Sequence, residues 1–76
     1  MNEFEWLDIF GDNLRDLMAG SGMTQGDLAK ELGVSESTIS KYLNKRQFPG
    51  VKTLVNLAYA LDCSLDDLMD FGDRIL

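Results

Sequence analysis

Residues 23–44 read MTQGDLAKELGVSESTISKYLN, and this stretch decides the fold. Thr24 and Asp27 have the capping-box spacing, which predicts that a helix begins directly after Thr24. Gly33 follows the apolar positions of that helix, where a glycine can end it in a left-handed conformation. Ser35 can cap a second helix directly afterwards. Because so short a turn forces the two helices to cross steeply, the pattern predicts a helix-turn-helix.

The spacing of apolar and small residues in this stretch resembles the Cro and lambda-repressor type of helix-turn-helix, also called the xenobiotic-response-element (XRE) family. The positions that carry the resemblance are Leu28, Ala29, Leu32, Gly33, Val34, Ile39 and Tyr42. The likeness extends over roughly residues 14–69 and includes Pro49 after the second helix of the motif. It implies an all-α fold: a compact five-helix bundle of the phage-repressor type, with a central helix-turn-helix at about residues 24–44. At 76 residues, the chain is expected to form a single domain over residues 1–76.

A helix is also expected before this motif, within residues 3–18. Its apolar stripe consists of Leu7, Phe10, Leu14 and Leu17, with Met18 beside it. Gly11 lies within the pattern and is expected to break it, which leaves a short leading segment and then a helix over about residues 12–19. Three large side chains fall outside the stripe and make this exposed end unusually apolar: Phe4, Trp6 and Ile9.

Two more helices are expected after the motif. From Val51, a fourth helix carries an apolar stripe made of Leu54, Leu57, Ala58 and Leu61. Ser64 and Asp67 repeat the capping-box spacing and predict a short fifth helix, whose inward residues are Leu65, Leu68 and Met69. In the loop before the fourth helix, Phe48 is expected to pack against the core rather than to stack on a base.

The residue types exclude several kinds of site within one chain. The sequence has one cysteine and no histidine. It can therefore form no internal disulfide, no zinc site of the usual kind and no Ser-His or Cys-His catalytic arrangement. We expect no metal, no cofactor and no enzymatic activity. No apolar run is long enough for a membrane span or a signal peptide, so a soluble, cytoplasmic protein is expected.

The charge distribution is compatible with a nucleic-acid partner despite a net charge of −6. Residues 1–22 and residues 62–76 each carry five acids and one base, whereas residues 23–61 carry five bases and three acids. The positive charge therefore lies on the motif, and salt screens distant acids over a Debye length of about 8 Å. We expect the acidic ends to weaken non-specific binding and to make the affinity sensitive to salt.

The polar face of the second motif helix supplies the candidate DNA contacts. By resemblance to the phage repressors, the residues that contact base edges in the major groove are Glu36, Ser37, Ser40 and Lys41. Glu36 can accept a hydrogen bond from cytosine and Lys41 can donate to guanine, although an acid at a helix start can also simply stabilise the helix dipole. The candidate phosphate contacts are Gln25, Thr38, Asn44, Lys45 and Arg46. For Lys45 and Arg46, the alternative is a solvated loop.

Two functions remain open at this point. The first is a regulator of transcription, a repressor that binds double-stranded DNA as a homodimer at a palindromic operator with half-sites about 34 Å apart. Its subunit contact is expected at the C-terminal end, because apolar residues there otherwise lack cover: Phe71, Ile75 and Leu76. The second is an acidic protein-interaction module, or an antitoxin-like partner protein, that binds another protein through its apolar ends, residues 4–10 and 70–76.

Overall fold

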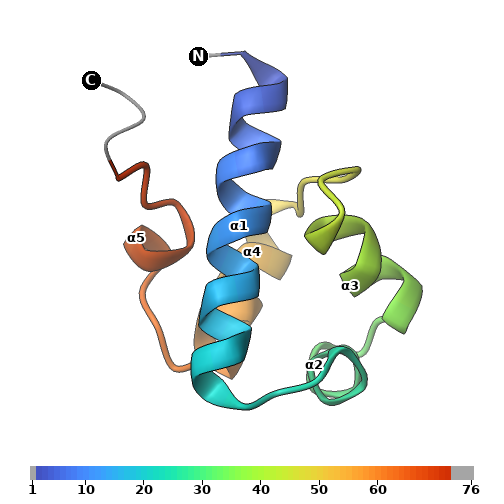
Figure 1. Ribbon diagram of the computed structural model, residues 1–76. Helices are drawn as coiled ribbons and strands as arrows, with labels where there is room; N and C mark the ends of the chain where they lie inside the picture. The colour runs from blue at the N-terminus through green and yellow to red at the C-terminus, as the bar shows by residue number, and fades with distance from the viewer. Residues whose placement is uncertain (1, 73–76) are drawn as a thin grey trace.

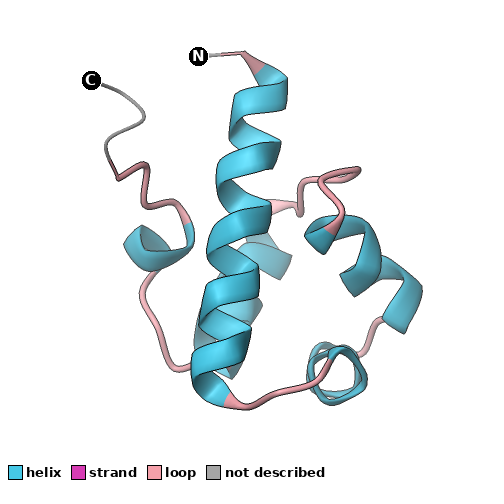
Figure 2. Ribbon diagram, in the orientation of Figure 1, coloured by secondary structure: helices cyan, strands magenta, loops and turns pink. Residues whose placement is uncertain are grey.

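The computed structural model describes residues 2–72 and consists there of five helices without a strand (Figure 2). In chain order these helices are α1 (Glu3–Ser21), α2 (Gln25–Leu32), α3 (Glu36–Leu43), α4 (Val51–Ala60) and α5 (Leu65–Leu68). α1 runs through the middle of the molecule, with α5 on one side and α2 and α3 on the other (Figure 1). The all-α, five-helix arrangement predicted from the sequence is confirmed.

Side-chain caps set the starts of the helices. Thr24 and Asp27 form both hydrogen bonds of a capping box, each 3.1 Å long. Ser35 accepts a hydrogen bond from the backbone N–H three residues later, at 3.2 Å. A second capping box, with bonds of 3.0 Å, joins Ser64 and Asp67. The three predicted caps are confirmed, and each contributes about 1 kcal/mol to the stability of its helix.

Four helices end with a left-handed residue: Gly22 after α1, with φ of 75°, and one residue each after α2, α3 and α4. In the last three, the residue that follows donates a backbone hydrogen bond back into the helix. Gly33 ends α2 in this way with φ of 70°, as predicted. Lys45 after α3 and Asp62 after α4 adopt the same conformation, with φ of 62° and 52°, although a Cβ makes it less favourable. The bonds that reach back run from the N–H of Val34 to the carbonyl of Ala29 (3.0 Å), from Arg46 to Lys41 (2.9 Å) and from Cys63 to Ala58 (2.9 Å).

α1 is continuous through Gly11, so the predicted break there, with a helix over about residues 12–19, is wrong. Gly11 is buried. A Cβ at this position would lie 2.8 Å from Cγ of Lys45 and 3.2 Å from the carbonyl oxygen of Tyr42. Both distances are shorter than favourable van der Waals contacts. The glycine therefore allows the end of α3 to pack closely against α1.

All five helices contribute buried side chains to one core. Its fully buried side chains are Phe10, Leu14, Leu28, Ile39, Leu57 and Leu68. Ile9 is also buried, with 1% exposure, although the periodicity placed it outside the stripe. The reason is that α1 is covered on two sides, by α3 and by α5. The inward position predicted for Leu65 is wrong, since this side chain is 43% exposed; in a helix of four residues, Leu68 alone takes the buried position.

The chain after α5 is held against α1. Nδ2 of Asn13 donates hydrogen bonds to the carbonyl oxygens of Leu68 at 2.9 Å and Asp70 at 2.8 Å. The ring of Phe71 meets that of Trp6 edge-on, with centroids 4.9 Å apart. Phe71 is therefore half-buried within its own chain, and the premise that it lacks cover is wrong. The other two residues of the predicted subunit contact, Ile75 and Leu76, lie outside the described residues.

Candidate nucleic-acid interface

α2 and α3 pack against each other at a steep angle, which Figure 1 shows by viewing α2 almost end-on beside α3. One face of α3 is buried in the core through Ile39, Tyr42 and Leu43. The opposite face is open to solvent and carries the predicted base contacts: Glu36, Ser37 and Lys41 are exposed, and Ser40 is half-buried. The division of α3 into an apolar inner face and a polar outer face is therefore confirmed.

The carboxylate of Glu36 lies against the N-terminal turn of α2. Its Oε1 is 3.0 Å from the position that a Cβ on Gly26 would occupy. The neighbouring Gln25, the first residue of α2, is exposed. The first turn of α3 is thus brought onto the first turn of α2, with a carboxylate near the positive end of the α2 dipole. This approach depends on the absence of a side chain at Gly26.

Three of the predicted contact residues form hydrogen bonds within the motif. Oγ1 of Thr38 lies 3.0 Å from Oγ of Ser35, and Nδ2 of Asn44 donates to Oγ of Ser40 at 3.1 Å. Thr38 and Ser40 are half-buried, and Asn44 is exposed. Because these bonds hold each side chain in one orientation, a ligand at this surface would meet polar groups that are already ordered.

The side chain of Lys45 is directed to α1. Its ammonium forms ion pairs with Asp8 at 2.5 Å and with Asp12 at 2.8 Å. Hydrogen bonds with Asp12 and Asp8 raise the pKa of Lys45 above its ordinary value. The other two predicted cationic contacts, Lys41 and Arg46, are exposed. The structure therefore brings Lys41 and Arg46 to the outer surface of the motif and places Lys45 against a neighbouring helix.

Sequence reasoning missed the contribution of Asp8, Gly11 and Asp12 to this surface. The two acids are one helical turn apart on α1, and the side chain of Lys45 lies over the glycine between them. Asp8 precedes Lys45 by 37 residues. No local sequence pattern connects residues so far apart. The one feature that could have indicated this contact is the pair of acids, Asp8 and Asp12, spaced one helical turn apart around Gly11.

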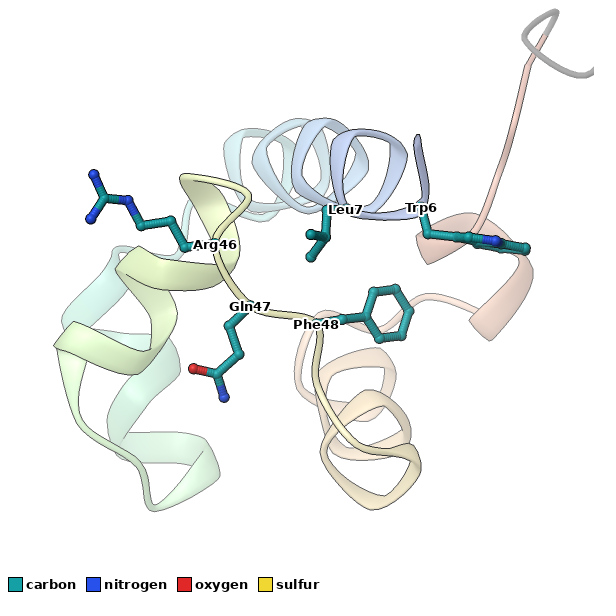
Figure 3. Close-up of a pocket in the computed structure, with 5 residues that line it drawn as sticks. All are labelled: Trp6, Leu7, Arg46, Gln47 and Phe48. Atoms are coloured by element: carbon teal, nitrogen blue, oxygen red, sulfur yellow. The ribbon is translucent and has the colours of Figure 1, made fainter. Parts of the chain in front are cut away.

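A surface hollow of about 600 Å³ lies between α1 and the connection from α3 to α4. The residues that line it are Trp6, Leu7, Arg46, Gln47 and Phe48. Figure 3 shows the ring of Phe48 beneath α1 and the guanidinium of Arg46 pointing away from the hollow. The centroid of the Phe48 ring is 5.1 Å from that of Phe10, which confirms the predicted packing of Phe48 against the core.

Within residues 2–72, neither a metal-binding cluster nor an activated thiol is formed. These residues include no group of three or more His, Cys, Asp or Glu side chains that could hold a metal ion. Cys63 is partly buried beside the core, and burial, with smaller effects of Asp67 and Asp62, raises the pKa of its thiol. The reactive thiolate is therefore disfavoured. In the same part of the chain, no helix has the length and apolar character needed to cross a membrane.

Comparison with known proteins matches the chain to helix-turn-helix proteins. The helix-turn-helix family matches residues 14–68. The HTH-type transcriptional regulator YqaE of Bacillus subtilis is 33% identical over 61 residues, which are 80% of this chain and 53% of YqaE. An HTH-type transcriptional regulator of Archaeoglobus fulgidus is 34% identical over 64 residues, which are 83% of this chain and 90% of that protein.

Among solved structures, the restriction-modification controller protein C.AhdI from Aeromonas hydrophila has a similar fold. Its TM-score is 0.76 at 29% sequence identity, and the similarity covers 82% of this chain and 94% of that chain. The chain therefore belongs to the helix-turn-helix family, as its resemblance to the XRE type predicts. It spans about half the length of YqaE, 53% of that relative.

Proposed function

We propose that this chain is a sequence-specific, DNA-binding regulator of transcription, a repressor that acts in the cytoplasm as a homodimer and inserts α3 into the major groove of a palindromic operator. The observation that carries the proposal is the two-faced α3, which is buried on one side and presents an exposed row of polar side chains on the other. The relatives named as transcriptional regulators support it. The proposal includes no catalytic step.

Base recognition is assigned to the outer face of α3. Lys41 donates to O6 and N7 of a guanine, and Glu36 accepts from N4 of a cytosine. Ser37 and Ser40 contact the neighbouring base edges. The exposed positions of Lys41 and Ser37 support these roles. The carboxylate of Glu36 has to turn from the first turn of α2, where it lies in the free protein, toward the groove.

Positioning on the DNA backbone is assigned to four residues at the edges of the motif: Gln25, Thr38, Asn44 and Arg46. Lys45, the fifth residue expected from the sequence, is paired with Asp8 and Asp12 of α1 in the free protein. Gln25 is exposed at the start of α2, where backbone N–H groups and the helix dipole favour an anion. Arg46 is exposed beyond the end of α3 and can pair with a phosphate oxygen. These contacts would fix the orientation of α3 and carry no sequence information themselves.

The subunit contact is assigned to the C-terminal end of the chain, through Phe71, Ile75 and Leu76. Phe71 packs against Trp6 but is only half-buried, so part of its ring is open to a second subunit. Sedimentation of a chain truncated after Gly72 tests it without removing any described contact. The truncated chain is expected to sediment as a monomer, and a dimer of unchanged stability would exclude Ile75 and Leu76 from the interface.

The function is tested by selecting bound duplexes from a random DNA library at moderate salt. Wild type is expected to enrich a palindromic sequence. Lys41→Ala should lose about 5- to 150-fold in affinity for each half-site and relax the preference at one position of each, because one bidentate base contact is removed from each subunit. Lys30→Ala is the matched control, since it removes the same exposed charge from α2 and should retain the sequence preference. Absence of enrichment at any salt concentration would refute the proposal.

A second candidate function is the acidic protein-interaction module or antitoxin-like partner protein. One observation favours it: at the start of α1, Phe4 is 78% exposed and Trp6 is 38% exposed. In this case Trp6→Ala and Phe71→Ala would abolish the function, whereas Lys41→Ala and Gln25→Ala would leave it intact. The opposite pattern is expected of the DNA-binding regulator.

A further inference from the structure

Two acids of α1 hold the lysine at the end of α3, and we refer to Lys45, Asp8 and Asp12 as the Lys45 clamp. We propose that this clamp masks Lys45 from DNA phosphates, so that Asp8 and Asp12 set the affinity and the salt dependence of DNA binding. The inference rests on the proposed DNA-binding function and assigns to two acids of α1 a part in it.

The backbone and the aliphatic part of Lys45 are both engaged in this contact. Residue 45 has φ of 62°, a conformation that costs energy for a residue with a Cβ. Its Cγ and Cε lie 2.8 and 3.3 Å from where a Cβ on Gly11 would be. Because position 11 has no side chain, the lysine lies flat on α1, and its ammonium reaches a carboxylate on either side.

The two ion pairs of the clamp oppose phosphate binding by Lys45. The carboxylates of Asp8 and Asp12 lie 2.5 and 2.8 Å from its ammonium, and all three side chains are partly open to solvent, with exposures of 34% for Lys45, 53% for Asp8 and 37% for Asp12. A phosphate that approached Lys45 would therefore have to compete with two carboxylates that already contact the ammonium. An ammonium that is already neutralised within the protein cannot replace the counterions of DNA. Lys45 should thus add little to the salt dependence of binding.

The two possible roles of Lys45 predict different salt slopes. If Lys41 in the major groove and Arg46 at the backbone, from both subunits, are the only cations that displace counterions from the DNA, log affinity falls against log salt with a slope of about −3.6. If Lys45 of both subunits also contacts phosphate, the slope is about −5.4. Between 50 and 200 mM salt, this difference amounts to an additional loss of about 12-fold in affinity.

The test measures affinity for the selected operator against salt in four proteins: wild type, Lys45→Ala, Asp8→Asn with Asp12→Asn, and all three substitutions together. Under the masking proposal, Lys45→Ala leaves the slope unchanged. Removal of the two acids steepens the slope by about 1.8, and the additional Lys45→Ala cancels this change. Asp16→Asn with Asp66→Asn is the matched control, because it removes two exposed acids that belong to no clamp contact; it should not steepen the slope.

Two outcomes would overturn the masking proposal and leave the proposed function standing. The first is a flatter slope for Lys45→Ala alone, which would show that Lys45 already contacts DNA. The second is equal steepening by both acid variants, which would reflect net charge alone. Circular dichroism establishes that each protein is folded. If the double acid variant unfolds, Asp12→Asn alone should give a smaller steepening in the same direction, and an unchanged slope would count against masking.

A failure of the proposed function gives a different result. If wild type binds no duplex in the selection, a random duplex serves as the probe at low salt. Binding by the Asp8→Asn, Asp12→Asn variant but not by wild type would support the masking of Lys45 and refute the operator-binding role. Binding by neither protein would refute both.

Discussion

Gly11→Ala should destabilise the protein, although glycine is a poor helix former. Gly11 is in the interior of α1, where replacement of glycine by alanine usually stabilises a helix by roughly 0.8–1.0 kcal/mol. Here the added methyl group would lie 2.8 Å from Cγ of Lys45 and 3.2 Å from the carbonyl oxygen of Tyr42. The first contact is with the middle of a side chain held by two ion pairs, and the second is with backbone. Neither neighbour can move without loss of other contacts.

Overpacking of this kind typically costs 1–3 kcal/mol, which outweighs the gain in helix propensity. We expect a net loss of about 1 kcal/mol, or a fall of about 4–8 °C in the melting temperature of a domain of this size. The assay is thermal and urea unfolding followed by circular dichroism. Gly20→Ala is the matched control in the same helix: a Cβ there meets nothing within 4 Å, so this variant should be more stable than wild type.

A further variant separates the two contacts of the added methyl group. In a Lys45→Ala background, the clash with Cγ is absent and only the approach to the Tyr42 carbonyl remains. Gly11→Ala should therefore cost less in this background than in wild type. If Gly11→Ala stabilises the protein as much as Gly20→Ala does, α1 has room for a side chain at position 11, and the argument from close packing is wrong.

Three other substitutions test the helix ends. Asp62→Gly should stabilise the protein by about 0.5–1 kcal/mol, because a left-handed residue loses its Cβ; Asp62→Asn, which removes only the charge, should change little in the same unfolding assay. Asn13→Ala should cost about 1–3 kcal/mol by leaving the carbonyl at the end of α5 without its donor, and amide hydrogen exchange at Leu68 should accelerate. Thr24→Ala should cost about 1 kcal/mol. The backbone N–H of Thr24, and to a smaller extent its side chain, lower the pKa of Asp27 from its ordinary 3.8, so the stability contributed by the Asp27 carboxylate is present above pH 3.8 and is lost as the pH falls through the lower folded-state pKa. In the Thr24→Ala variant, which keeps the backbone N–H, an NMR titration should show the Asp27 pKa moved only part of the way toward 3.8, and an unchanged pKa would mean that the Thr24 side chain does not contribute to the shift.

The parts of the fold that local chemistry controls could be predicted from the sequence. The caps at Thr24, Ser35 and Ser64 each depend on residues within one turn, and all three form as expected. The inner and outer faces of α3 follow from helical periodicity, so the exposure of Glu36 and Lys41 could also be predicted.

The sequence predictions fail where segments that are far apart in the chain pack against each other. Gly11 was interpreted by its helix propensity, whereas its neighbours in space are Tyr42 and Lys45 at the far end of the motif. Ile9 is buried because α1 is covered from two sides. A prediction from one apolar stripe assumes that a helix is buried on one face only. The left-handed conformation of Lys45 was missed because only glycine marks that position reliably in a sequence.

Consecutive residues of α1 hold the ends of α3 and α5, the two helices next to the proposed DNA contact and the proposed subunit contact. Asp12 holds the end of α3 through Lys45, and Asn13 holds the end of α5. Because α1 is one unbroken helix, it acts as a rigid bar without a hinge between these attachments. In a dimer joined through the C-terminal segment, both copies of α3 would be fixed at one separation and one rotation. One extra base pair between the half-sites would displace them by about 3.4 Å and rotate them by about 35°, a mismatch that only the DNA could accommodate by twisting.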